Sequence, residues 1–198
     1  LHHTSSVAAV TSADRGRGAM KLEDAFPDTD GLVTAEPGII LGVTTADCLP
    51  VFVWGENRRV IGVAHAGWKG LAGGILQNLV DKMMDIAPVK PEELRALIGV
   101  GVEAECYPVA EERLLQFQGL SAEDINYRRE GQVHLDLKKA ASLYLQAKGM
   151  PEDNIIVQPE CSCCDNEYPS FRRDGEDFQP DLAVITETSA EPAARSVK

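Results

Sequence analysis

Runs of apolar residues predict several strands in the first half of the chain. Residues 39–46 (IILGVTTA), 49–55 (LPVFVWG) and 59–66 (RVIGVAHA) are rich in β-branched side chains and almost continuously apolar. Such runs are typical of strands that are buried on both faces. A shorter strand is predicted within residues 31–38, before the turn at Pro37-Gly38. The first half of the chain is therefore expected to contain several consecutive strands.

The apolar period changes to that of a helix after the third of these strands. One helix is predicted from Leu71 to Ile86, because apolar side chains recur there every three or four residues. Residues 109–118 are also expected to be helical. A further amphipathic helix is predicted over residues 136–148, with Asp136 as its N-cap and a stop at Gly149.

Strands return between and after these helices, within residues 93–102, 154–159 and 181–186. Several consecutive strands mixed with helices favour an α+β fold, with mixed β-sheets packed with helices, over a regular βαβ array. No linker is visible, so we predict a single domain over residues 1–186. Residues 187–198 carry no core pattern and are expected to form a mobile tail.

Charge and composition limit the classes of function. The 198 residues are 44% hydrophobic and 25% charged, with a formal net charge of −12. A negative field of this size disfavours binding to nucleic acid. No apolar run approaches the roughly 18 residues of a membrane span. We therefore expect a soluble protein. The net charge does not exclude a small anionic ligand in a local basic pocket, for which Lys69, Arg172 and Arg173 are the candidates.

Cysteine usage indicates a reducing compartment. The chain has five cysteines, an odd number, and three of them are crowded at Cys161, Cys163 and Cys164. This is a poor framework for disulfides, so a cytoplasmic protein is expected. A zinc knuckle at the crowded segment is disfavoured because no second pair of ligands follows it, and a loop of packed thiols is the preferred interpretation.

Cys48 and His65 each stand at the end of a predicted strand, and two chemistries are open to them. Cys48 could be a thiolate nucleophile with His65 as its base and Asp47 as the group that orients the base. Alternatively, Cys48 and His65 could bind Zn²⁺ with a further histidine, which must be His2, His3 or His134. The preferred interpretation of His134 is a surface position beside the start of the helix at 136–148.

The motifs TTADCLPVFV, VAHAGWKGLAGGIL and FRRDG together resemble those of the laccase-domain family, also called the polyphenol oxidase or YfiH-like family. The resemblance extends over nearly the whole chain. It implies the YfiH-like fold and a zinc ion held by His3, Cys48 and His65. Here the segment around His3 reads LHHTSSV, and His3 is matched to the family's histidine because Val7 then falls at the position of the family's valine.

The resemblance also implies an activity on purine nucleosides in the cytoplasm. The implied reactions are zinc-dependent phosphorolysis of adenosine, inosine, guanosine and methylthioadenosine, and deamination of adenosine. Asp47 is then the candidate proton shuttle, while Lys69, Arg172 and Arg173 are the candidates for binding phosphate. Trp68 is expected either to stack on the base or to act as a structural wedge. A cysteine-dependent hydrolase and a non-catalytic zinc-binding module are the alternative functions.

Two further expectations follow from the resemblance. The family's name suggests a multicopper oxidase, but four histidines are too few for such a cluster. Copper remains the alternative ion at the three-residue site, since it binds nitrogen and sulfur donors more tightly than zinc. The chain is also expected to be truncated at its N-terminus relative to the family, and its EAECYPV segment (103–109) departs from the family's GPCCYEV-like pattern.

Overall fold

A six-stranded mixed sheet forms the centre of the molecule, in the order β1-β2-β5-β4-β6-β9. The computed structural model describes residues 3–55 and 59–187. The central strands pair antiparallel, whereas β1 and β9 join the two edges in parallel. The strands are Val7–Ala9 (β1), Gly31–Thr34 (β2), Leu49–Gly55 (β4), Ile61–Ala66 (β5), Leu94–Ile98 (β6) and Ile155–Val157 (β9).

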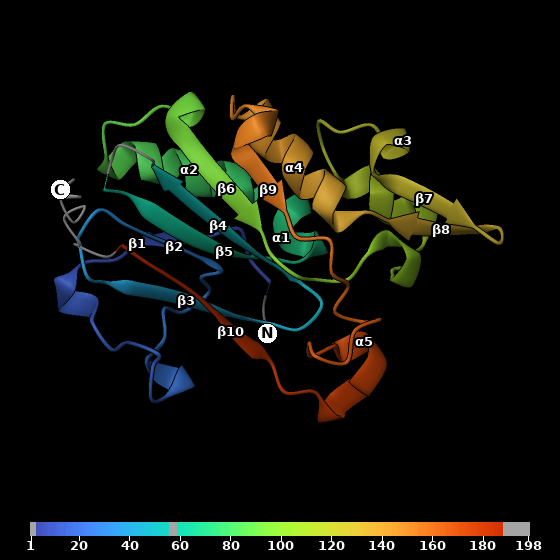
Figure 1. The fold of residues 1–198 in the computed structure, drawn as a ribbon, viewed down its shortest axis with the longest axis horizontal. Helices are drawn as coiled ribbons and strands as arrows, with labels where there is room; N and C mark the ends of the chain where they lie inside the picture. The colour runs from blue at the N-terminus through green and yellow to red at the C-terminus, as the bar shows by residue number, and fades with distance from the viewer. Residues whose placement is uncertain (1–2, 56–58, 188–198) are drawn as a thin grey trace, which may run out of the picture.

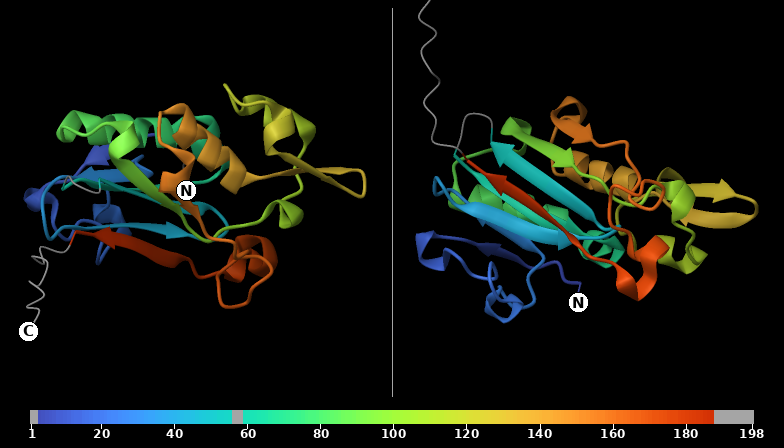
Figure 2. Two further views of the ribbon diagram at one scale, coloured as in Figure 1. Left: turned by 45° about the horizontal axis from the view of Figure 1, so that its top comes forward. Right: turned by 60° about the horizontal axis from the view of Figure 1, so that its bottom comes forward.

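Two layers cover this sheet, one on each face (Figures 1 and 2). Helices Ile75–Ile86 (α2) and Leu137–Ala147 (α4) lie on one face, and the antiparallel pair Ile40–Thr45 (β3) and Asp181–Thr186 (β10) lies on the other. The alternation of side chains along β4 serves both layers. Val51 and Val53 belong to the core under the helices, while Phe52 and Trp54 pack into the core under β3 and β10.

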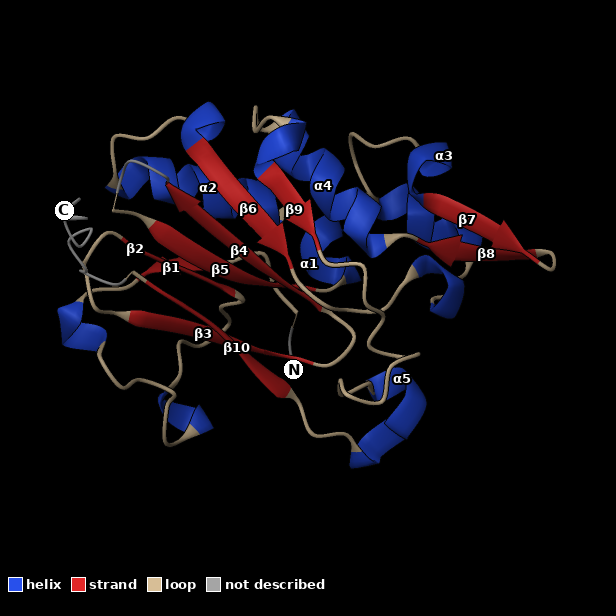
Figure 3. Cartoon of the chain, viewed as in Figure 1, coloured by secondary structure: helices blue, strands red, loops and turns tan. Residues whose placement is uncertain are grey.

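Shorter elements surround the layers (Figure 3). Trp68–Ala72 (α1) follows β5 directly, and a hairpin of Asn126–Arg129 (β7) and Gln132–Leu135 (β8) projects to one side of the molecule. The remaining short helices are Ala122–Ile125 (α3) and Phe171–Asp174 (α5). Short 3₁₀ helices span Ser12–Asp14 (η1), Leu22–Asp24 (η2), Pro91–Glu93 (η3), Ala104–Cys106 (η4), Glu111–Gln116 (η5), Glu152–Asn154 (η6) and Gly175–Asp177 (η7).

The predicted fold class and strands are confirmed, with three corrections. The single helix predicted from Leu71 to Ile86 is divided into α1 and α2 at Gly73 and Gly74, where Gly74 has a φ of 85°. This left-handed conformation costs glycine little, but it ends a right-handed helix. Residues 109–118 contain a 3₁₀ segment in place of an α-helix. His134 is buried within β8, with 5% of its surface exposed, and is not at the surface.

Two predictions concern residues that the structure does not describe. His2 and the tail predicted over 187–198, apart from its first residue, lie outside the described residues. Within the part that is described, no helix has both the length and the apolar character needed to cross a membrane.

Candidate metal centre and its surroundings

The pairing of β4 with β5 brings Cys48 beside the end of the strand that carries His65. Pro50 pairs with His65, so Cys48 lies opposite Gly67, just beyond the paired residues. A Cβ atom at Gly67 would lie 2.8 Å from the Sγ of Cys48 and 3.7 Å from the Nδ1 of His3. A real side chain at this position would clash with the sulfur, so the absence of a Cβ at Gly67 lets Cys48 and His3 approach the same point.

His65 is oriented so that one of its ring nitrogens is free to bind an ion. Its Nδ1 lies 2.8 Å from the carbonyl oxygen of Thr44 on β3. A carbonyl oxygen only accepts hydrogen bonds, so Nδ1 carries the proton and Nε2 has a free lone pair. That Nε2 is buried and has no hydrogen-bond partner among the described residues. Orientation of one imidazole nitrogen by a backbone carbonyl is typical of histidines that bind a metal through the other.

The segment that follows His3 is tied to the residue before β2 and to helix α2. The two imidazole centroids are 5.2 Å apart. The carboxylate of Asp30 accepts a hydrogen bond from the amide that follows His3, and the side-chain amide of Asn78 donates to the carbonyl of Ser5 at 2.7 Å. Burial and the charge of His65 lower the pKa of His3, which favours the neutral imidazole that metals require.

The surroundings of Cys48 favour the protonated thiol over the thiolate. Burial, followed by the negative charges of Asp47 and Asp30, raises the pKa of Cys48 to about 12. A nucleophilic cysteine needs a lowered pKa, so this environment does not favour the cysteine-dependent hydrolase. A bound cation deprotonates a coordinating thiol outright, and the same carboxylates would attract that cation.

The donor set of two imidazoles and one thiol fits zinc, which binds nitrogen and sulfur ligands and keeps a fourth position open at catalytic sites. The candidate ligand atoms are farther apart than in a closed metal site, because those of His3, Cys48 and His65 do not all lie within 4.8 Å of one another. Zinc binding at these residues therefore remains a prediction, supported by the free Nε2 of His65 and by the approach of Cys48 and His3 to Gly67.

Aromatic and basic side chains gather beside this centre. The guanidinium of Arg113 lies 4.4 Å from the ring centroid of Trp68, and the Nζ of Lys69 lies 5.7 Å from the same ring. The guanidinium of Arg172 lies 4.7 Å from the ring of Tyr107. Burial raises the pKa of Tyr107, while the charges of Arg113 and Arg172 lower it, so one tyrosine is close to both arginines.

Tyr107 connects this basic group to the candidate ligands, since its phenol also interacts electrostatically with Cys48. Lys69 and Arg172 were candidates from the sequence, whereas Tyr107 and Arg113 were missed. In the sequence, segment 103–109 is distinguished only by its departure from the family pattern. Nothing in the sequence around Arg113 indicates a functional role, because the pattern of apolar and polar residues there resembles that of an ordinary surface helix.

The two adjacent arginines have different surroundings. The guanidinium of Arg173 donates to the carbonyls of Ser162 (2.9 Å), Asp165 (3.0 Å) and Tyr168 (2.9 Å), and makes two more bonds to Asp174. These bonds use all five of its N–H donors. Arg173 therefore holds the loop together and has no donor left for phosphate. The guanidinium of Arg172 makes no hydrogen bond or ion pair within the described ranges and lies on Tyr107.

Asp47 holds the same loop from the other side. Its Oδ1 accepts hydrogen bonds from the hydroxyls of Ser162 and Ser170, both at 2.7 Å, and its Oδ2 accepts from the amide of Arg172 at 2.7 Å. Its φ of 76° lies in the left-handed region, which aspartate tolerates better than most residues. These contacts make Asp47 a positioning residue for the loop. The proton shuttle expected from the resemblance remains a prediction.

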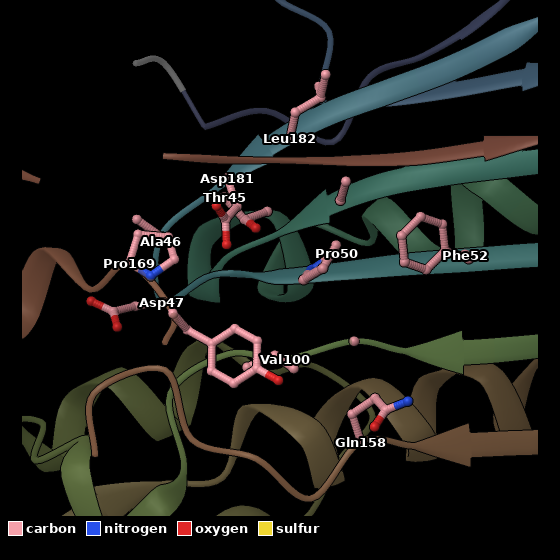
Figure 4. A pocket seen from close by; sticks show the side chains of 13 residues that line it. Thr45, Ala46, Asp47, Pro50, Phe52, Val100, Gln158, Pro169, Asp181 and Leu182 are labelled. Carbon is pink, nitrogen blue, oxygen red and sulfur yellow. The ribbon is translucent and has the colours of Figure 1, made fainter. Parts of the chain in front are cut away.

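A hollow of about 360 Å³ adjoins Asp47 (Figure 4). Figure 4 shows Asp47 at one end of this hollow and Phe52 and Gln158 at the other. No histidine or cysteine lines it, so the hollow is next to the candidate metal centre but does not contain it. A second hollow, of about 440 Å³, is lined in part by Arg113.

The crowded cysteines form a separate group that could hold a metal. The Sγ atoms of Cys106, Cys161 and Cys164 all lie within 4.8 Å of one another. In the described part of the chain this is the one set of three or more histidine, cysteine, aspartate or glutamate side chains that meets this distance. The sequence predicted a loop of packed thiols, and the structure adds Cys106 to it from a distant segment.

The arrangement of the three layers is that of single-domain α+β proteins of the YfiH and YlmD type. The crystal structure of YlmD from Geobacillus stearothermophilus superposes with a TM-score of 0.88 at 32% identity, over 94% of this chain and 71% of that chain. A Bacillus licheniformis protein, YfiH, gives a TM-score of 0.86 at 31% identity, over 93% of this chain and 71% of that one.

The chain belongs to the family described as multi-copper polyphenol oxidoreductase laccase, whose model matches residues 1–185. Purine nucleoside phosphorylase YlmD of Geobacillus stearothermophilus is 36% identical over 177 residues, which are 87% of this chain and 65% of the relative. Adenosine deaminase RL5, from an unknown prokaryotic organism, is 32% identical over 173 residues, or 85% of this chain and 65% of the relative. The chain thus spans a little less than two thirds of the length of these curated relatives.

Proposed function

We propose that this protein is a zinc-dependent purine nucleoside phosphorylase that also deaminates adenosine, with His3, Cys48 and His65 as the zinc ligands. The observation that carries the proposal is the buried Nε2 of His65, which has no hydrogen-bond partner in the part of the chain that is described and whose ring lies 5.2 Å from that of His3. Cys48 and His3 in turn approach the same point at Gly67. The relatives named purine nucleoside phosphorylase and adenosine deaminase supply the substrate class. The substrates are then purine nucleosides and phosphate.

Zinc fits this centre better than a multicopper cluster. The whole sequence contains four histidines. One of them, His134, is buried in β8 with its Nδ1 at 2.8 Å from the carbonyl of Ala104. Too few imidazoles remain for several copper ions, whereas two imidazoles and one thiolate suffice for a single zinc. A single copper ion remains the alternative occupant of the same three donors.

The chain's own residues provide the rest of the chemistry. A zinc ion, when bound, would supply Lewis-acid chemistry at its open coordination position. Lys69, Arg113 and Arg172 would concentrate positive charge around phosphate in a protein whose net charge is −12. Trp68 and Tyr107 offer aromatic rings to the flat purine base. Asp47 would fix the loop that carries Arg172 and is the candidate for moving a proton.

The two arginines provide a matched pair of variants. Arg172→Ala should raise the KM for phosphate about tenfold with little change in melting temperature, because its guanidinium is free to bind an anion. Arg173→Ala should lower the melting temperature by several degrees, because three backbone carbonyls and Asp174 lose their donor. Phosphate kinetics and thermal unfolding are measured on both proteins. Equal effects of the two substitutions on KM would contradict the distinction.

The products formed from adenosine test the function itself. The zinc-loaded protein is incubated with adenosine with and without phosphate, and the products are separated by chromatography. Adenine that appears only with phosphate demonstrates phosphorolysis, and inosine demonstrates deamination. Unchanged adenosine under both conditions would favour the non-catalytic zinc-binding module. Full activity of metal-free protein, lost on alkylation of Cys48, would instead support the cysteine-dependent hydrolase.

A further inference from the structure

We propose that Cys106, Cys161 and Cys164 form a second, structural site for a thiophilic metal ion such as zinc. This site is separate from the His3, Cys48 and His65 centre, and the inference does not depend on the proposed activity. All three sulfurs lie within 4.8 Å of one another. Three thiolates are a soft donor set, which selects zinc or cuprous ions over magnesium or calcium.

Two of the ligands are arranged as in a metal-binding turn. Cys161 and Cys164 are separated by two residues, a spacing common in structural zinc sites. The chain turns sharply here, because the amide of Asp165 donates to the carbonyl of Cys161 at 3.0 Å. The turn brings the two sulfurs to the same side, where they form two corners of a site.

A backbone amide ties the Cys161 sulfur to the segment that carries Cys106. The amide of Glu103 donates to the Sγ of Cys161 at 3.4 Å. Glu103 immediately precedes η4, which ends at Cys106. This hydrogen bond therefore fixes the Cys161 sulfur relative to the third ligand.

The third ligand comes from a distant part of the chain that is already fixed in place. Cys106 ends η4 and approaches Cys164 with their sulfurs 3.1 Å apart. The buried Nζ of Lys138 joins the two segments, since it donates to the carboxylate of Glu103 and to the carbonyls of Gln158 (2.6 Å) and Glu160 (2.8 Å). These bonds hold the segment of Cys106 against the segment that leads to Cys161. Zinc–sulfur bonds of about 2.3 Å would require only a modest separation of the sulfur pair.

An ion at this site would fix two loops that adjoin the centre formed by His3, Cys48 and His65. Tyr107 immediately follows Cys106. Ser162, inside the metal-binding turn, donates to Asp47. The ion would thus link the loop of Tyr107 to the loop that Asp47 holds, without touching substrate. We infer a stabilising and positioning role, in which bound metal favours the folded state.

Metal counting on matched variants tests this site. Wild-type protein, Cys106→Ser, Cys48→Ser and Cys163→Ser are stripped with a chelator, loaded with Zn²⁺ under a phosphine reductant without oxygen, desalted and analysed for zinc per chain. Cys163 lies in the same turn but outside the group of three, so its variant is the control. We expect Cys106→Ser to hold one zinc fewer than the wild type and Cys163→Ser to hold the same number.

The number of zinc ions per chain separates this inference from the proposed function. Cys48→Ser should hold one ion fewer than the wild type, whatever the result for Cys106→Ser. Equal zinc content in wild-type and Cys106→Ser protein, both folded by circular dichroism, would overturn the second site. If Cys106→Ser fails to fold, alkylation of the wild-type protein followed by peptide mapping replaces it. Zn²⁺ should then protect Cys106, Cys161 and Cys164 together, and equal labelling of these thiols with and without Zn²⁺ would refute the proposal.

Discussion

His65→Ala protein is expected to fold normally, to bind one zinc ion fewer than the wild type, and to lose activity on adenosine by at least about 100-fold. The size follows from the several kcal/mol that a metal ion contributes to a transition state, at about 1.4 kcal/mol for each factor of ten. The fold should survive because the side chain of His65 makes one hydrogen bond, to the carbonyl of Thr44, within the described residues. Zinc content and kcat/KM are the two measurements.

Cys163→Ser is the control for this variant, since its thiol belongs to neither group of candidate ligands. It should keep both the zinc content and the activity of the wild type. The unfolding temperatures of the metal-free proteins show whether His65→Ala has damaged the fold. Normal turnover by folded His65→Ala protein would reject His65 as a ligand.

Asp47→Ala is expected to destabilise the protein by about 3–5 kcal/mol. The substitution removes the acceptor of three hydrogen bonds, and it leaves the hydroxyls of Ser162 and Ser170, which are 3% and 0% exposed, without this partner. Unsatisfied buried polar groups cost about 1–3 kcal/mol each. Alanine also tolerates the φ of 76° less well than aspartate. Denaturant unfolding measures the loss.

Two further substitutions at this position separate the causes. Asp47→Gly removes the acceptor but permits the positive φ, so it should be less damaging than alanine. Asp47→Asn keeps the shape and one acceptor oxygen and should recover much of the stability. If Asp47 also transfers a proton, Asp47→Asn will change the pH profile of kcat, whereas a purely positioning role will leave the profile unchanged. An Asp47→Ala protein as stable as the wild type would show that these bonds do not hold the loop.

The strands before and after Cys48 were predictable because they carry a local signal. The continuous apolar runs there correspond to β3, β4 and β5, but only β4 and β5 lie in the six-stranded sheet, whereas β3 pairs with β10 in the second layer. The division between α1 and α2 was missed because the apolar period continues across it, while the break depends on the backbone of Gly73 and Gly74. The burial of His134 also depends on long-range packing, since its Nδ1 lies 2.8 Å from the carbonyl of Ala104 and Pro108 pairs with it.

The candidate ligands were identified through family motifs, and spacing alone left the third ligand open. The structure adds a physical reason in the pairing of β4 with β5 and the missing side chain at Gly67. Contacts between remote segments were beyond sequence reasoning. Arg113 on Trp68 and Cys106 beside Cys164 join residues that no local pattern connects. The different surroundings of Arg172 and Arg173 likewise depend on how a loop folds, because the two residues are identical in type and adjacent.

X-ray absorption at the zinc edge tests most directly whether two imidazoles and one thiolate hold the ion. The measurement uses Cys106→Ser protein loaded with one equivalent of Zn²⁺, so that the three-cysteine group cannot compete. The predicted shell has one sulfur at about 2.3 Å and light donors, two of them imidazole nitrogens, at about 2.0–2.1 Å. The sulfur should disappear when Cys48 is also changed to serine. A shell of several sulfurs, or one without imidazole scattering, would contradict the account.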